Sequence, residues 1–303
     1  MSRARQVLPG KIVMVTRRCH ERRFFLHGCP LMNQVIEYLV AVGCQRYDIV
    51  LLAIVVMSNH YHLVAEDVLG RHPELTCWLH SQLAKAGNCV RGRSDSMWEC
   101  GEPNVVELAD FETVLDKCAY VLANPVRAGL VKNGHEWIGV RSDADAVLTK
   151  PRRIAKPDIP YFAGPEWPDE VELRFDVPPS LAHMTAEELA ERLKERAAKV
   201  EAEARAEVKA KGLEFAGVER LRRRRWQDRA AAPDREARGR TIKPLVAARS
   251  KALRRAVLDR LATFRRAYRA AREAFVSGQR DVLFPYGTWA MVHTHGAAHH
   301  PPP

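Results

Sequence analysis

The segment that decides the fold runs from Ile49 to Val64 and reads IVLLAIVVMSNHYHLV. Its first eight residues are apolar, which is typical of a buried strand, and the polar pair Ser58-Asn59 predicts a tight turn before a second strand. Side chains alternate between the two faces of a strand, so His60 and His62 project from one face and Tyr61 from the other. Two imidazoles on one face are either half of a metal site or a polar rim at the end of a sheet.

The surrounding pattern alternates strands with helices. Strands are predicted at Lys11–Thr16, Asp48–Met57, His60–Ala65 and Asn104–Leu108, and helices at Pro30–Val42, Pro73–Val90 and Asp110–Asn124. The resulting order of strand, helix, strand, strand, helix, strand is that of a ferredoxin-like, split βαβ domain of the α+β class.

The rest of the 303-residue chain differs in composition. Seven prolines fall between Pro151 and Pro179, which disfavours long regular elements there. We therefore expect an N-terminal domain at 1–148, a Pro-rich linker at 149–180, a helical basic region at 181–290 and a disordered tail at 291–303. Thr185 and Glu188 match a capping box, which predicts a charged helix that continues to about Lys211.

The positive charge of the chain is concentrated in one segment. Between Arg220 and Arg272 there are 19 Lys and Arg against four Asp and Glu, a net charge of +15, whereas the whole chain carries +11. The remainder is therefore slightly acidic, and the excess favours a polyanionic partner over a merely solvated surface. Within this segment Leu253, Val257, Leu261, Phe264, Tyr268 and Phe275 are spaced as one helical stripe, which favours core packing over a coiled coil.

The seven cysteines indicate a reducing compartment. They include no C-x-x-C pair, and no apolar run is long enough for a membrane span or a signal peptide. We therefore expect a cytoplasmic protein with reduced thiols.

A candidate nucleophile lies in the predicted helix that ends in Tyr120-Val121-Leu122-Ala123-Asn124-Pro125. At about 100° per residue, Tyr120 falls opposite the apolar arc of this helix, whereas most helical tyrosines bury their rings on the apolar face. Asn124 is one turn further on and therefore a neighbour of Tyr120. Taken alone, this segment favours an exposed surface tyrosine beside a helix-ending Asn-Pro.

Together, MSNHYHLV (residues 57–64) and YVLANPVRAGLV (residues 120–131) resemble the single-tyrosine HUH transposases, specifically the REP-associated tyrosine transposase branch. HUH denotes two histidines separated by a bulky hydrophobe, here Tyr61. The resemblance covers roughly residues 10 to 135, and the Pro-rich segment and basic helical region depart from it.

The resemblance implies a set of roles. His60, His62 and Asn124 would hold a divalent metal, Mg²⁺ or Mn²⁺, and Tyr120 would attack single-stranded DNA at hairpin-bearing ends, leaving a 5′-phosphotyrosine and a free 3′-OH. It also implies a homodimer, associated with the nucleoid of the cell. Neutral imidazoles and an amide oxygen leave the charge of a cation free to polarise a phosphodiester.

Further arginines are candidate DNA contacts, with exposed solubilising residues as the alternative for each. They are Arg17, Arg18, Arg22, Arg23, Arg91, Arg93, Arg127, Arg222, Arg223, Arg224 and Arg225. Two other functions stay open. One is a domesticated DNA- or RNA-binding protein that no longer cuts. The other is a ferredoxin-like RNA-binding module, although its sheet should expose alternating aromatic side chains, of which these strands offer few.

Overall fold

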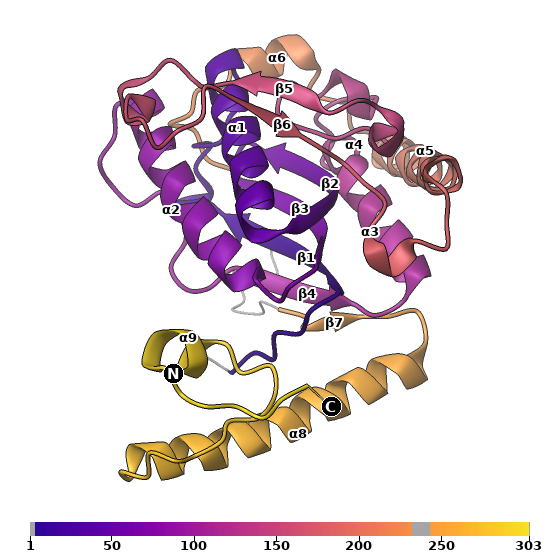
Figure 1. The fold of residues 1–303 in the computed structure, drawn as a ribbon. Helices are drawn as coiled ribbons and strands as arrows, with labels where there is room; N and C mark the ends of the chain where they lie inside the picture. Colours follow the sequence, from indigo (N-terminus) through magenta and orange to yellow (C-terminus); the bar gives the residue numbers. More distant parts are fainter. Residues whose placement is uncertain (1–3, 232–242, 303) are drawn as a thin grey trace.

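A mixed sheet forms the centre of the protein in the computed structural model, which describes residues 4–231 and 243–302 (Figure 1). Its strands are β1 (Lys11–Arg18), β2 (Ile49–Met57), β3 (His60–Asp67), β4 (Asn104–Leu108) and β7 (Val246–Ala247). The order across the sheet is β2-β3-β1-β4-β7. Neighbouring strands are antiparallel except for β4 and β7, which pair in parallel.

Helices cover both faces of this sheet. α1 (Pro30–Tyr47) and α2 (His72–Arg91) lie together on one face, and α3 (Phe111–Leu122) and α5 (Ala186–Ala210) pack on the other (Figure 1). The alternation of strand side chains supplies both cores. In β1, Val13 and Val15 belong to the core under α1 and α2, whereas Ile12 and Met14 belong to the core under α3 and α5.

The predicted order of elements in the first half of the chain is confirmed, with differences at some ends. α1 continues past Val42 to Tyr47, and Asp48 ends it in a left-handed conformation with φ of 53°. The helix expected at 110–124 is divided into α3 and the short α4 (Asn124–Arg127). Pro125 explains the division, because proline lacks a backbone N–H and favours the first turn of a new helix.

The Pro-rich segment packs along α1. It contains the antiparallel strands β5 (Arg152–Ala155) and β6 (Glu170–Leu173) and several short 3₁₀ turns. Tyr38 of α1 holds it through two contacts: the ring lies 5.2 Å from the ring of Phe162, and the hydroxyl donates to the carbonyl of Pro168 at 2.6 Å.

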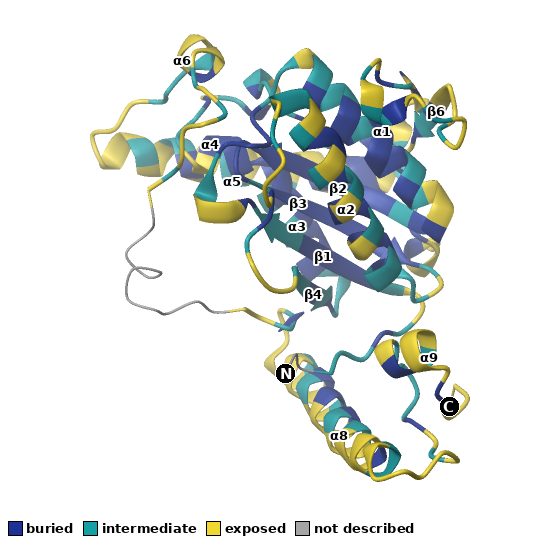
Figure 2. Cartoon of the chain, turned by 90° about the vertical axis from the view of Figure 1, so that its left-hand side faces the viewer, coloured by how far each residue is buried: buried dark blue, intermediate teal, exposed yellow. Residues whose placement is uncertain are grey.

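The basic region supplies further helices around the sheet. α5 begins with the predicted capping box of Thr185 and Glu188, and α6 (Val218–Arg222), β7 and α8 (Lys251–Val276) follow. The apolar stripe of α8 is buried as expected at Val257, Leu261 and Phe264, whereas its other faces are largely exposed (Figure 2). Residues 232–242, which carry part of the basic charge, lie outside the described residues.

Near the C-terminus, α9 (Ala290–His295) is followed by an extended segment at residues 297–302 that turns back along the chain. This extended segment packs on Phe284, which is fully buried and whose backbone bonds to Ala298 and His300. All seven cysteines are free thiols. In the described part of the chain, no helix is long and apolar enough to cross a membrane.

Candidate functional site

His60 and His62 lie together at the start of β3. The Ser58-Asn59 turn brings β3 back along β2, and the strand alternation aims both imidazoles into one cavity of about 300 Å³. Their ring centroids are 4.9 Å apart, in an edge-to-face arrangement. Tyr61 points to the opposite face, where its hydroxyl lies 2.6 Å from Nε2 of His80 in the core.

Tyr120 reaches the same cavity from α3. Its ring centroid is 5.5 Å from that of His62, and both residues line the cavity. Two cations flank the phenol ring: the Arg127 guanidinium lies 4.6 Å from its centroid, and the Lys117 ammonium lies 5.8 Å away. The helix therefore presents Tyr120 to the sheet face that carries the histidines, although the two segments are far apart in sequence.

Each imidazole is oriented through its Nδ1 atom. Nδ1 of His60 lies 2.7 Å from the amide oxygen of Asn59, and Nδ1 of His62 lies 2.7 Å from the hydroxyl of Thr16. With Nδ1 engaged in this way, Nε2 is the nitrogen of each ring left to act as a ligand or base. Metal-binding histidines are commonly oriented by such a bond from the other ring nitrogen.

Both histidines are held neutral. Burial, with Arg18 and Arg22 nearby, lowers the pKa of His60 to about 4. Burial and the neighbouring His60 and Lys117 hold the pKa of His62 well below its usual range. A neutral imidazole is the form that binds a metal or accepts a proton, so the pair is in that form at neutral pH.

Arginines form the rim of the cavity. Arg17, Arg18 and Arg22 line it together with Glu99 and Lys243. Arg18 is fixed by two parallel bonds to Glu99, of 3.0 and 2.5 Å, and Arg17 donates to the carbonyl of Gly101. A concave site with this cationic rim favours an anion such as a phosphodiester.

Asn124 is placed differently from the two histidines. It is buried at the start of α4, one turn beyond Tyr120, and it is not among the residues that line this cavity. Among the residues that the structure describes, no group of three His, Cys, Asp or Glu side chains could hold a metal ion. The donor chemistry of His60 and His62 fits a divalent cation, and Asn124, the third ligand predicted from the sequence, would add an amide oxygen.

The other predicted arginines divide into four that line a second cavity and three that line neither cavity. Arg91, Arg222, Arg224 and Arg225 line a second cavity. Arg93 lies over the ring of Phe25, Arg23 donates to the carbonyl of Gln227, and Arg223 is exposed and lines neither cavity.

Two residues of the site could not be selected from the sequence. Thr16 is the register partner of His62 across the β1–β3 pair, and register between strands that are distant in sequence leaves no local signal. Lys243 reaches the rim from the basic region. The only sequence feature that could have indicated Thr16 is its position at the end of the predicted strand Lys11–Thr16.

Comparison with known proteins gives little independent guidance. No protein-family model and no curated protein matches the chain. The chain is similar to a solved structure of a REP-associated tyrosine transposase bound to a REP hairpin, with 19% sequence identity over 45% of this chain and 80% of the other. The TM-score is 0.38, so this likeness does not establish a common function.

Proposed function

We propose that the protein is a metal-dependent single-stranded DNA endonuclease and strand transferase, with Tyr120 as nucleophile. The observation that carries the proposal is the meeting of His60, His62 and Tyr120 in one cavity with a cationic rim. A polar rim at a sheet end, the alternative for the histidines, gives no reason for a tyrosine to face them from a separate helix.

The proposal includes the finer description of the fold. The strand order β2-β3-β1-β4, with α1 and α2 on one face, supports a ferredoxin-like, split βαβ domain of the HUH type. In this description α3 crosses the other face and carries the nucleophile to β3.

His60 and His62, with Asn124, would hold Mg²⁺ or Mn²⁺ in this proposal. The bound cation would polarise the scissile phosphate and offset its negative charge. The contributions of the chain itself are two neutral imidazoles oriented by Thr16 and Asn59.

In the proposed reaction the hydroxyl oxygen of Tyr120 attacks the phosphorus of a phosphodiester. A bond forms between this oxygen and phosphorus, and the bond from phosphorus to the 3′ oxygen breaks. The phenol loses its proton and the leaving oxygen gains one, so the products are a 5′-phosphotyrosine and a 3′-OH. Attack by the 3′-OH of another strand rebuilds a phosphodiester and restores the phenol.

The cationic neighbours of Tyr120 fit this role. Arg127 and Lys117 flank the ring, and Arg17, Arg18 and Arg22 surround the space in front of it. These groups would bind the phosphates on either side of the cleavage point, and they carry no sequence information in themselves. A hairpin-bearing substrate and a homodimer belong to the same proposal and follow from the motif resemblance.

The test is formation of a covalent protein–DNA adduct. The full chain is incubated with single-stranded hairpin oligonucleotides and Mg²⁺ or Mn²⁺, and adducts that survive denaturation are separated on a gel. The adduct should form with the native chain, disappear in Tyr120→Phe and persist in Tyr268→Phe, a tyrosine of α8 outside the site. DNA affinity should be nearly unchanged in both variants.

An adduct of equal yield in Tyr120→Phe would assign the chemistry to another nucleophile. Tight binding of the same oligonucleotides without any adduct, with either metal, would favour the alternative, a domesticated DNA- or RNA-binding protein that no longer cuts.

A further inference from the structure

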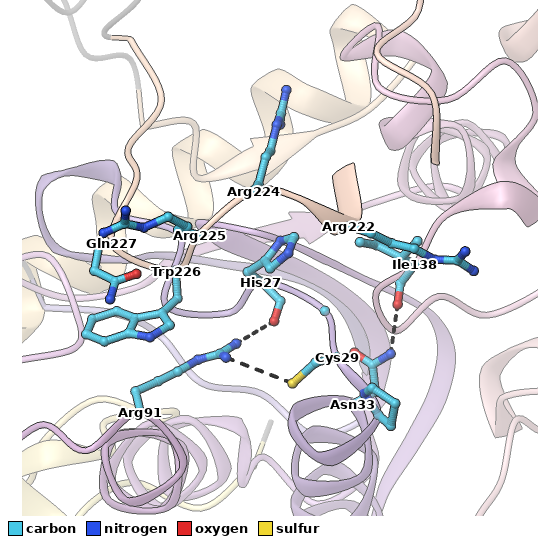
Figure 3. A pocket seen from close by; sticks show the side chains of 12 residues that line it. His27, Cys29, Asn33, Arg91, Ile138, Arg222, Arg224, Arg225, Trp226 and Gln227 are labelled. Carbon is cyan, nitrogen blue, oxygen red and sulfur yellow. Dashed lines mark hydrogen bonds between the residues drawn. The ribbon is translucent and has the colours of Figure 1, made fainter. Parts of the chain in front are cut away.

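A second cavity, which we call the arginine pocket, lies beside the Ser58-Asn59 turn that precedes the two histidines. It has a volume of about 530 Å³ and is lined by Arg91, Arg222, Arg224, Arg225, Trp226 and His27, among others (Figure 3). None of its lining residues is an Asp or a Glu. Its size falls within the range of about 300–1,000 Å³ that is usual for small-ligand sites.

The arginines of the pocket are held in place rather than carried on a free tail. Leu221, just before them, is fully buried in the core under α3 and α5. After them, the Phe24 amide donates to the carbonyl of Asp228 at 2.9 Å, and the Ala230 amide donates to that of Arg22 at 3.2 Å. These contacts fix residues 222–227 over the loop that follows β1.

The positive charge of the pocket has little internal compensation. Arg222 pairs with Glu219 at 3.0 Å, and the Asp228 carboxylate beside the pocket accepts from the Arg225 backbone amide at 2.9 Å, but the Arg225 guanidinium makes no ion pair with any residue that the structure describes. Burial and the neighbouring arginines lower the pKa of His27, so this ring adds no charge at neutral pH. Like charges gathered in a concavity repel one another, and an anion relieves that repulsion.

Trp226 adds an aromatic surface to this cationic cavity. Its ring packs against Phe25, with centroids 6.1 Å apart, and is only half-buried. Figure 3 shows the indole on the same side of the pocket as Arg91, with Ile138 and Arg222 on the other side. An aromatic face beside guanidinium groups is the combination that binds nucleotides of single strands, because every base can stack and every phosphate is anionic.

The pocket is connected to the candidate active site through one short segment. Arg22 lines the active-site cavity, whereas His27 lines the arginine pocket. Nδ1 of His27 lies 3.3 Å from the hydroxyl of Ser58, and the Leu26 amide donates to the Ser58 carbonyl. Ser58 precedes His60 by two residues, so the pocket and the candidate active site flank the same turn.

We propose that the arginine pocket binds one nucleotide of the single-stranded DNA, outside the cleaved phosphodiester, with its phosphate at Arg225 and its base against Trp226. This subsite rests on the proposed function only for the identity of the strand. A free nucleotide carries the same phosphate and base, and the experiment distinguishes binding of a free nucleotide from binding of a nucleotide within a DNA strand.

Photocrosslinking gives a direct test. Hairpin oligonucleotides with 5-iodouracil at successive positions of their single-stranded flank are bound to the full chain, irradiated and digested with trypsin. The expected crosslink, at one or two adjacent positions only, is to the peptide Trp226–Arg229. An excess of a free nucleoside monophosphate should leave this crosslink unchanged, whereas unlabelled hairpin should remove it.

Affinity measurements with matched variants complete the test. Arg225→Gln should weaken binding of the flanked hairpin and lower the log–log salt slope by about 0.7, whereas the exposed neighbour Arg223→Gln should change the affinity far less. Loss of stacking in Trp226→Leu should weaken binding about 5- to 150-fold, and Trp226→Phe should restore most of it. A hairpin whose flank is too short to reach the pocket should bind all of these chains equally.

The outcomes separate this subsite from the proposed function. A crosslink at Trp226 without any Tyr120 adduct would support the subsite and overturn the function. An adduct that forms while crosslinks avoid Trp226, with Arg225→Gln equal to Arg223→Gln, would overturn the subsite alone. Removal of the crosslink by free nucleotide at low concentration, or absence of strand binding, would overturn the assignment to DNA.

Discussion

The hydroxyl of Thr16 lies 2.7 Å from Nδ1 of His62, across the β1–β3 pair. The contact fixes the imidazole plane and leaves Nε2 as the nitrogen for a ligand. When a residue that bonds the other ring nitrogen of a metal-bound histidine is replaced, metal affinity commonly falls by about 10- to 100-fold.

Thr16→Val should therefore weaken metal binding by about 10- to 100-fold, because valine keeps the shape of threonine but loses the hydroxyl. Thr16→Ser retains the hydroxyl and should bind almost as the native chain. Calorimetric titration with Mn²⁺ measures both. Equal affinities in the valine and serine variants would contradict a role of Thr16 in orienting His62.

Arg127 should position the nucleophile. Its guanidinium lies 4.6 Å from the centroid of the Tyr120 ring, an arrangement worth about 0.5–2 kcal/mol. Arg127→Gln should slow adduct formation by roughly 2- to 30-fold. Arg192→Gln removes a comparable contact, 5.5 Å from the ring of Phe111 and outside the cavity, and should leave the rate unchanged. The rates of adduct formation by the two variants are compared in single-turnover experiments at saturating DNA.

The strands and helices up to residue 122 could largely be predicted from the sequence, because hydrophobic periodicity is a local signal. β4, for example, begins and ends as expected at Asn104 and Leu108. The predicted end of α1 at Val42 is wrong, because the helix continues through Gly43 to Tyr47. In the structure Gly43 is interior, and a Cβ there would lie 2.7 Å from the Leu75 side chain. The glycine permits close packing of α1 on α2, a tertiary reason invisible in the local sequence.

The candidate site could be predicted only in part. Strand alternation placed His60 and His62 on one face, and the helical angle turned Tyr120 away from the apolar arc of α3. The contacts of Thr16 with His62 and of Asp228 with Phe24 join segments distant in sequence. Such pairing depends on the register and packing of the whole chain, and no local pattern records it.

Stability should fall in mild acid because His80 is buried in neutral form. Burial, with Arg17 nearby, lowers its pKa to about 3, whereas the unfolded chain has the ordinary value near 6.5. Below pH 6.5 the unfolded state binds the proton and the folded state does not, so stability decreases as the pH falls from about 6.5 toward 3. At pH 5 the loss is on the order of 2 kcal/mol.

Urea denaturation at pH 7.5 and pH 5 measures this loss. His27, His60 and His62, whose pKa values are also lowered, act in the same direction. His80→Gln should be less stable at pH 7.5, because the bond to Tyr61 is perturbed, but its stability should depend less on pH. An unchanged pH dependence in this variant would contradict the assignment to His80.

Because α5 packs on α3, the helical basic region at 181–290 contributes to the fold that holds Tyr120. Leu189 of α5 is fully buried in the same core as Val114 and Cys118 of α3, and Arg196 pairs with Glu112 at 2.8 Å. Leu189→Ala should lower the free energy of unfolding by about 2–5 kcal/mol, because it removes buried methyl groups and leaves a cavity. Leu213→Ala, at a position 62% exposed, should change it by less than about 0.5 kcal/mol. If both variants unfolded at the native urea midpoint, α5 would not stabilise α3, and residues after 180 would form a separate unit. If only Leu189→Ala lowers the free energy of unfolding, and if it also reduces the yield of the Tyr120 adduct, then the basic region supports the site through packing as well as through charge.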